Sequence, residues 1–117
     1  MNTIEINSPT DRLQQVINCK REKNVQLNFA INDYVSLKLA YEQKKNELLL
    51  TTDFKAVLDE SRPIVAMKEA WIENALFEEK MEVNIAKENV NSIKRDIDFL
   101  NDEIRLYSYQ CEMELNK

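Results

Sequence analysis

The chain has 117 residues, a net charge of −5 and neither glycine nor histidine, although about 7% glycine is usual in soluble proteins. Without glycine, the phosphate-binding loops, dinucleotide fingerprints and nucleophile elbows that need a positive φ or a close backbone approach are excluded. Without histidine, there is no histidine general base, no Ser-His-Asp triad and no histidine-ligated metal, so we expect no enzyme activity, no catalytic residue, no cofactor and no metal site.

A first long helix is predicted over residues 9–50, after an N-terminal tail of residues 1–8. Ser8 can cap this helix and Pro9 suits its first position. Apolar residues then recur at three- and four-residue steps as far as Leu48, which is the spacing of one helix face. The polar stretch 20–24 interrupts this face and predicts a bend or fraying near Asn24. We favour a solvated face there over a contact with nucleic acid.

A short helix is predicted over residues 53–60, because Thr52 or Asp53 can cap it. Ser61-Arg62-Pro63 then ends this helix and begins another, since the residue before proline avoids the helical region and Ser61 can act as a cap.

A second long helix is predicted over residues 63–116, where the sequence has no breaker. Fourteen positions in it alternate at steps of four and three residues, which is the seven-residue repeat of a coiled-coil seam. Such a helix would be about 80 Å long, so the fold class we expect is all-α, an elongated antiparallel helical hairpin or coiled coil with a short connecting helix. The seam positions are Val65, Glu69, Ile72, Leu76, Glu79, Val83, Ala86, Val90, Ile93, Ile97, Leu100, Ile104, Tyr107 and Cys111.

The charges beside this seam predict a homo-oligomer. Lys80, Lys87 and Lys94 flank it on one side, and Glu82, Asp96 and Glu103 flank it on the other. Basic residues at one flank and acidic residues at the other permit two copies to pair in parallel, whereas an antiparallel pair of copies would bring like charges together.

Two surfaces are candidate protein interfaces. If the helix ends near 50 and 63 lie side by side, residue 104 lies opposite residue 9. The C-terminal seam then lacks a partner within the hairpin, and it needs Ile4 and Ile6, a second copy or another protein. This seam surface comprises Ile97, Leu100, Ile104, Tyr107 and Cys111.

The other candidate interface is an apolar patch off the seam, formed by Trp71, Phe77, Met81 and Ile85. A helix that is apolar on two sides must bury both of them. The short helix can cover Trp71, which leaves the other three residues for another subunit or a target protein. Beside them, Glu73, Glu78 and Glu82 form an acidic face that either imitates nucleic-acid phosphates or is simply solvated; a solvated face is the commoner case.

The setting inferred from the sequence is the cytoplasm. No apolar run is long enough for a transmembrane span and no secretory signal is visible, so no membrane association is expected. The distant pair Cys19 and Cys111 does not form a disulfide framework. Direct binding to nucleic acid is disfavoured, because residues 63–117 carry seven basic and twelve acidic side chains.

One segment carries a resemblance. The sequence Thr52-Asp-Phe, Val57-Leu, Ser61-Arg-Pro and Val65-Ala-Met-Lys-Glu69, followed by a long charged helix, resembles small uncharacterised helical proteins of phages and prophages of low-GC Gram-positive bacteria. The resemblance covers the segment 48–70 and, by composition, the rest of the chain to residue 117. It implies a short protein of the infected host cell, from early genes for replication, recombination or host takeover, and it supplies no catalytic residues.

We therefore expect a non-enzymatic protein-binding adaptor or accessory protein that acts early in phage infection, with a phage or host protein as its partner. Its partner could belong to the replication or recombination machinery. Two alternatives remain open. One is an inhibitor of a host enzyme or defence nuclease, acting by occlusion as anti-CRISPR proteins do or through acidic mimicry. The other is a structural or assembly chaperone.

Overall fold

The computed structural model describes residues 8–116 and, over this range, contains helices and no strand. The elements are α1 (Pro9–Thr51), α2 (Phe54–Val57), α3 (Val65–Ala75) and α4 (Phe77–Leu115). The predicted tail, including Ile4 and Ile6, lies outside the described residues except for Ser8.

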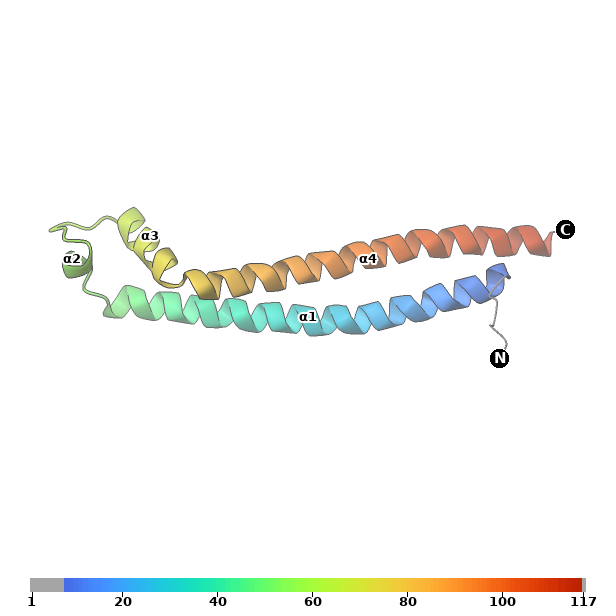
Figure 1. The fold of residues 1–117 in the computed structure, drawn as a ribbon, viewed down its shortest axis with the longest axis horizontal. Helices are drawn as coiled ribbons and strands as arrows, with labels where there is room; N and C mark the ends of the chain where they lie inside the picture. The colour runs from blue at the N-terminus through green and yellow to red at the C-terminus, as the bar shows by residue number, and fades with distance from the viewer. Residues whose placement is uncertain (1–7, 117) are drawn as a thin grey trace. The chain divides into compact units, whose positions relative to one another are not determined.

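The helices form two compact units, which are described separately. Unit 1 contains the chain up to Ala30 and from Val90 onward, and unit 2 contains Ile31–Asn89. In each unit a stretch of α1 packs antiparallel to a stretch of α4 (Figure 1). The predicted fold class, an all-α antiparallel helical hairpin, is confirmed.

Helix α1 begins and ends close to where its sequence predicts. The Asp11 backbone N–H donates to Ser8 Oγ at 3.1 Å, so Ser8 caps the helix as expected. The helix is continuous through residues 20–24, so the fraying expected near Asn24 is wrong. At the other end the Thr51 hydroxyl donates to the Glu47 carbonyl at 2.8 Å.

Helix α2 is shorter than predicted because the backbone turns left-handed directly after it. Asp53 caps its start by accepting the Ala56 N–H at 3.3 Å. Two hydrogen bonds then close its end: the Asp59 N–H donates to the Ala56 carbonyl at 3.4 Å, and the Glu60 N–H donates to the Lys55 carbonyl at 3.2 Å. These two bonds form a Schellman motif, which requires a positive φ at Asp59, where φ is 49°. The helix therefore ends at Val57 and not at residue 60.

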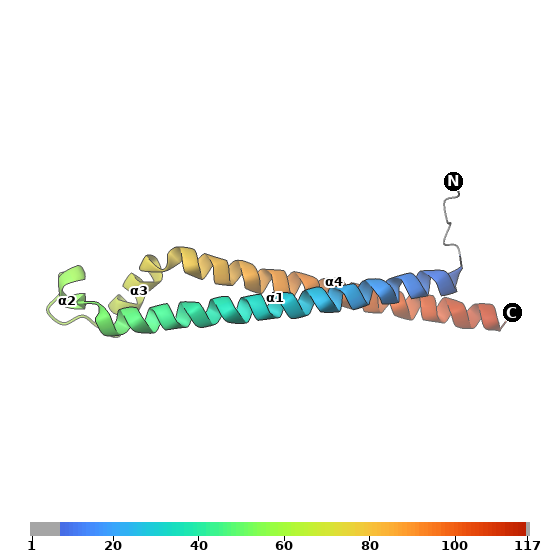
Figure 2. The ribbon, with the colours of Figure 1, turned by 90° about the horizontal axis from the view of Figure 1, so that it is seen from below.

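The single helix predicted over 63–116 is wrong in two respects. Its start moves to Val65, after an extended Ile64 with no side-chain cap, so Ser61 does not cap it. It is also interrupted at Leu76, where ψ is 26°, so that α3 is inclined to α4 (Figure 2). The Leu76 N–H still donates to the Ile72 carbonyl at 2.8 Å, so the interruption bends the helix with little loss of backbone bonding.

The seven-residue seam is confirmed from Ile72 onward and is wrong before it. Val65 is 68% exposed and Glu69 is also exposed, because α3 leans away from the line of α4. From Ile72 the predicted positions turn toward α1, whose buried residues are Val16, Ala30 and Tyr41. The buried seam positions of α3, α4 and the turn between them are Ile72, Leu76, Val83, Ala86, Val90 and Ile93.

The pairing register of α1 with α4 differs from the one expected if the helix ends near residues 50 and 63 lay side by side. In unit 2 the Lys44 ammonium lies 3.6 Å from the Glu79 carboxylate, whereas the estimate places residue 79 opposite residue 34. In unit 1 Thr10 Oγ1 lies 3.7 Å from Cys111 Sγ. The estimate failed because residues 52–75 fold as α2 and α3, so pairing with α1 begins later along the chain. The C-terminal seam therefore has a partner in α1.

Two of the six charges expected to join two parallel copies, Lys80 and Asp96, contact α1 of the same chain. The Lys80 ammonium lies 5.2 Å from the centre of the Tyr41 ring, and Asp96 pairs with Lys23 at 3.1 Å. A parallel pair formed through this seam would have to displace α1. The predicted homo-oligomer therefore needs a different face.

A designed disulfide tests the register in unit 1. We expect Thr10→Cys, in a Cys19→Ser background, to form a disulfide with Cys111 on air oxidation, because the two side chains are already in contact. Closing a loop of this length raises the free energy of unfolding by about 4 kcal/mol. Non-reducing peptide mapping and urea unfolding measure the two effects. The control is Gln14→Cys, one turn along α1; cross-linking of this variant as readily as Thr10→Cys would contradict the register.

The left-handed residue after α2 is tested by substitution. We expect Asp59→Gly to raise the free energy of unfolding by about 1 kcal/mol, because glycine adopts positive φ without a steric penalty. Asp59→Val should lower it by at least as much, since a β-branched residue is poorly tolerated there. Thermal or urea unfolding followed by circular dichroism measures both, and equal stability of the two variants would contradict the assigned conformation.

Candidate functional site: an exposed apolar patch on α4

Unit 2 has a complete apolar core of its own. The cluster comprises Tyr41, Phe54, Ile72, Leu76 and Val83, with Ile72 fully buried. Half-buried side chains pack around this cluster, namely Tyr34, Leu37, Leu48, Leu58 and Trp71. Burial of a side chain such as Ile72 contributes about 2 kcal/mol, so this end of α1 is held to α2 and α3 by packing.

Trp71, one of the predicted interface residues, belongs mainly to this core. Its ring packs edge-on against the Phe54 ring, with centroids 5.8 Å apart and planes at 89°. The Lys68 ammonium covers the same Phe54 ring at 5.6 Å. The short helix thus covers Trp71, as the sequence predicts, and little of this side chain is left for a partner.

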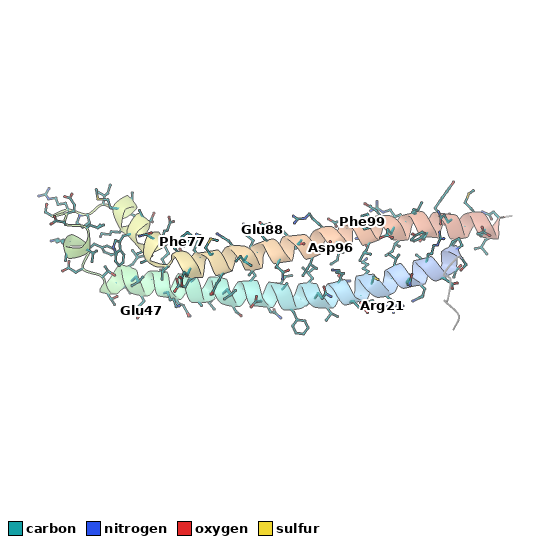
Figure 3. The ribbon with its side chains drawn as sticks, viewed as in Figure 1. Arg21, Glu47, Phe77, Glu88, Asp96 and Phe99 are labelled. Carbon is teal, nitrogen blue, oxygen red and sulfur yellow. The ribbon has the colours of Figure 1, made fainter. Side chains whose placement is uncertain are left out.

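The other three predicted patch residues remain exposed. Phe77, Met81 and Ile85 are 60%, 43% and 64% exposed, respectively. They are spaced four residues apart from the first residue of α4 and so form one stripe. Figure 3 labels Phe77 at the start of this stripe. We call these three residues the α4 patch.

The patch leads into a groove between α1 and α4 of unit 2. The groove has a volume of about 390 Å³. Leu37, Ile85 and Ala86 supply its apolar surface, and Asp33 from α1 and Glu82 from α4 each add a carboxylate to its lining. An apolar side chain next to a cationic group matches this groove, because its lining combines apolar residues with carboxylates.

The predicted acidic face is not one continuous surface. Glu78 and Glu82 are exposed one turn apart on α4, whereas Glu73 lies on α3, before the bend at Leu76. Glu79 turns to Lys44 instead. The structure therefore brings Glu78 and Glu82 together beside the α4 patch and separates Glu73 from them.

The C-terminal interface residues lie against α1. Ile97, Leu100, Ile104 and Tyr107 are half-buried along the same seam as the buried Val90 and Ile93. Cys111, also half-buried, contacts Thr10. The expectation that this seam lacks a partner within the chain is wrong, because α1 already covers it.

Sequence reasoning missed a second exposed apolar surface on α4. In unit 1, Phe99, Leu106, Tyr109 and Met113 are 64%, 51%, 60% and 54% exposed. The seven-residue spacing of Phe99, Leu106 and Met113 could have revealed it, because it repeats the period of the seam two positions further along the chain.

No site for a metal ion is assembled among residues 8–116, where no three or more Cys, Asp or Glu side chains converge. Cys19 and Cys111 are free thiols. None of the helices over this range is long and apolar enough to cross a bilayer. No protein-family model, curated protein or solved structure matches the chain.

The core of unit 2 contains one unpaired polar group that can be tested. The Tyr41 hydroxyl is buried and has no hydrogen-bond partner among the described residues. We expect Tyr41→Phe to raise the free energy of unfolding by about 1 kcal/mol, because a buried hydroxyl without a partner is destabilising. Tyr34→Phe, at the half-buried edge of the cluster, is the control and should change stability by less. Urea unfolding measures both, and a loss of 1 kcal/mol or more in Tyr41→Phe would contradict this interpretation.

Proposed function

We propose that this chain is a non-enzymatic protein-binding protein whose α4 patch contacts its partner. One observation carries the proposal: the core of unit 2 is closed without Phe77, Met81 and Ile85, yet these large apolar side chains form an exposed stripe. Contiguous apolar residues of this kind are typical of protein interaction sites. A partner helix or loop that covers the stripe would bury three anchor side chains together.

The composition supports a binding role over a catalytic one. The sequence contains no histidine, which is the common general base, and no glycine, which the common phosphate-binding loops require. The groove between α1 and α4 of unit 2 is lined mainly by apolar side chains and carboxylates, which can bind and orient a partner.

The resemblance of residues 48–70 supports a setting in phage infection. On that basis the partner is a phage or host protein that acts early in infection, for example in replication or recombination. The groove favours one alternative, an inhibitor that occludes a basic surface of a host enzyme, because Asp33 and Glu82 line it beside apolar residues.

Variants of the patch test the proposal. We expect a Phe77→Ser, Met81→Ser, Ile85→Ser triple variant to lose at least 90% of the partner recovered by the tagged wild-type protein from infected cells. Quantitative mass spectrometry measures recovery, and repeat binding with the purified partner confirms that the contact is direct. The fold should survive, because all three side chains are exposed, and circular dichroism checks this.

The matched control lies on α1 of the same unit. Val35 and Leu39 are 55% and 58% exposed, so Val35→Ser with Leu39→Ser removes exposed apolar side chains from α1 and leaves the α4 patch intact. The control should recover the partner as the wild type does. Equal recovery by the triple variant would contradict a role for the patch.

A further inference from the structure

The charges of unit 2 are divided between the two sides of the seam where α1 packs against α4. Asp33 and Glu82 lie on one side, because both line the groove between the two helices. Glu78 is one turn before Glu82 on α4, and Glu47 is two seven-residue repeats after Asp33 on α1, so both fall on the same side. All four side chains are exposed. We call these four residues the acidic face of unit 2.

Lysines occupy the other side of the seam. Lys38 follows Asp33 by five residues on α1, and this interval is about 140° around a helix. Lys87 follows Glu82 by the same interval on α4. A second lysine lies seven residues from each of these two and so in line with it. We call the resulting set the basic face of unit 2; it comprises Lys38, Lys45, Lys80 and Lys87.

The remaining charged residues of α1 and α4 in unit 2 leave this division intact. Lys44 and Glu79 neutralise each other, with 3.6 Å between the ammonium and the carboxylate. Glu42 stands at the edge of the basic face and offsets one of its four lysines. Glu88 lies on the side of α4 away from α1 (Figure 3). Negative charge therefore predominates on one face and positive charge on the other.

Each face brings like charges together from both helices. The Lys80 ammonium lies 5.2 Å from the centre of the Tyr41 ring of α1, and Lys38 is within one turn of Tyr41 on the same side of the seam. Asp33 and Glu82 in turn line one groove. Paired helices commonly place opposite charges at such flanks. None of these four charged side chains forms an ion pair within the described part of the chain, so both faces lack a counter-charge there.

The two faces complement each other, and they occupy the same stretch of unit 2. Glu82 is two residues from Lys80 on α4, and Asp33 is five residues from Lys38 on α1, which are separations of about 3 and 8 Å along a helix. A second copy that lies alongside the first in the same orientation therefore sets its basic face level with the acidic face of the first. The α4 lysines of one copy then lie along the α4 carboxylates of the other.

We propose that copies of this chain associate side by side, with the basic face of unit 2 in one copy against the acidic face of unit 2 in the next. The contact is heterologous, because each copy uses two different faces, so association continues beyond two copies. It leaves α1 in place on the seam, unlike the parallel pair expected from the sequence. Phe77 and Met81 of the α4 patch belong to neither face and stay open to the partner of the proposed function.

Sedimentation velocity of the full chain over a range of concentrations tests the association. At low salt we expect the weight-average mass of the wild type to rise above that of two chains as its concentration increases. At high salt the mass should return to that of one chain, because exposed charges are screened by ions. A wild type that stays monomeric at low salt would overturn the proposal, and so would a species that stops at two copies.

A matched pair of charge reversals locates the acidic face. Glu82→Lys and Glu88→Lys change the net charge equally, and both positions are exposed on the same helix. Glu82→Lys should weaken association at least tenfold, whereas Glu88→Lys should associate as the wild type does. Equal weakening by both variants would assign the effect to net charge and would remove the location.

Complementary variants test whether the two faces pair with each other. Lys38→Glu with Lys87→Glu, and Asp33→Lys with Glu82→Lys, should each be monomeric alone, and circular dichroism checks that both remain folded. Mixed in equal amounts they should associate, because the first retains the acidic face and the second retains the basic face. A mixture that stays monomeric while the wild type associates would contradict this pairing.

One further variant separates self-association from partner binding. Phe77→Ser with Met81→Ser should self-associate as the wild type does, whatever its recovery of the partner from infected cells. A failure of the function proposed for the α4 patch is thereby distinguished from a failure of the contact between copies. Loss of self-association in this variant would place the contact on the patch and overturn the assignment to the charged faces.

Discussion

The structure depends on covering one apolar stripe of α4 that repeats every three to four residues. A single helix that exposes such a stripe to water is unfavourable, so the stripe must be covered. Helix α1 covers it in both units. The residues buried along it, such as Val83 and Val90, each contribute on the order of 1–3 kcal/mol through the area they remove from water. The ion pairs Lys23–Asp96 and Lys44–Glu79 are partly exposed, so they contribute little to stability and help to select the register.

In this chain without glycine, aspartate occupies the special backbone positions at both ends of α2. Asp53 caps α2 at its start and Asp59 takes the left-handed conformation at its end. Aspartate enters this region more readily than most residues other than glycine. A chain with few turns can therefore dispense with glycine, because one aspartate supplies the positive φ that α2 requires.

The sequence predicts what is local and misses what depends on packing between distant segments. The bounds of α1, the caps at Ser8 and Asp53 and the seam from Ile72 onward follow from periodicity and short-range hydrogen bonds, and all were predictable. The bend at Leu76 and the register were not, because both depend on how segments far apart in the sequence pack together. For the candidate sites, exposure of Phe77, Met81 and Ile85 followed from the pattern, whereas the cover over Ile104 and Cys111 required the register to be known.

The lysines on the face of α1 that packs against α4 affect the local stability of unit 1. Lys20 and Lys23 occupy half-buried positions where unit 2 has tyrosine and leucine, and the seam of α4 is only half-buried beyond Ile93. Local opening needs less free energy where less apolar surface is buried. Amide hydrogens near Tyr107 should therefore exchange with solvent faster than those near Val83. The exposed apolar residues from Phe99 to Met113 thus lie in the more readily opened part of α4.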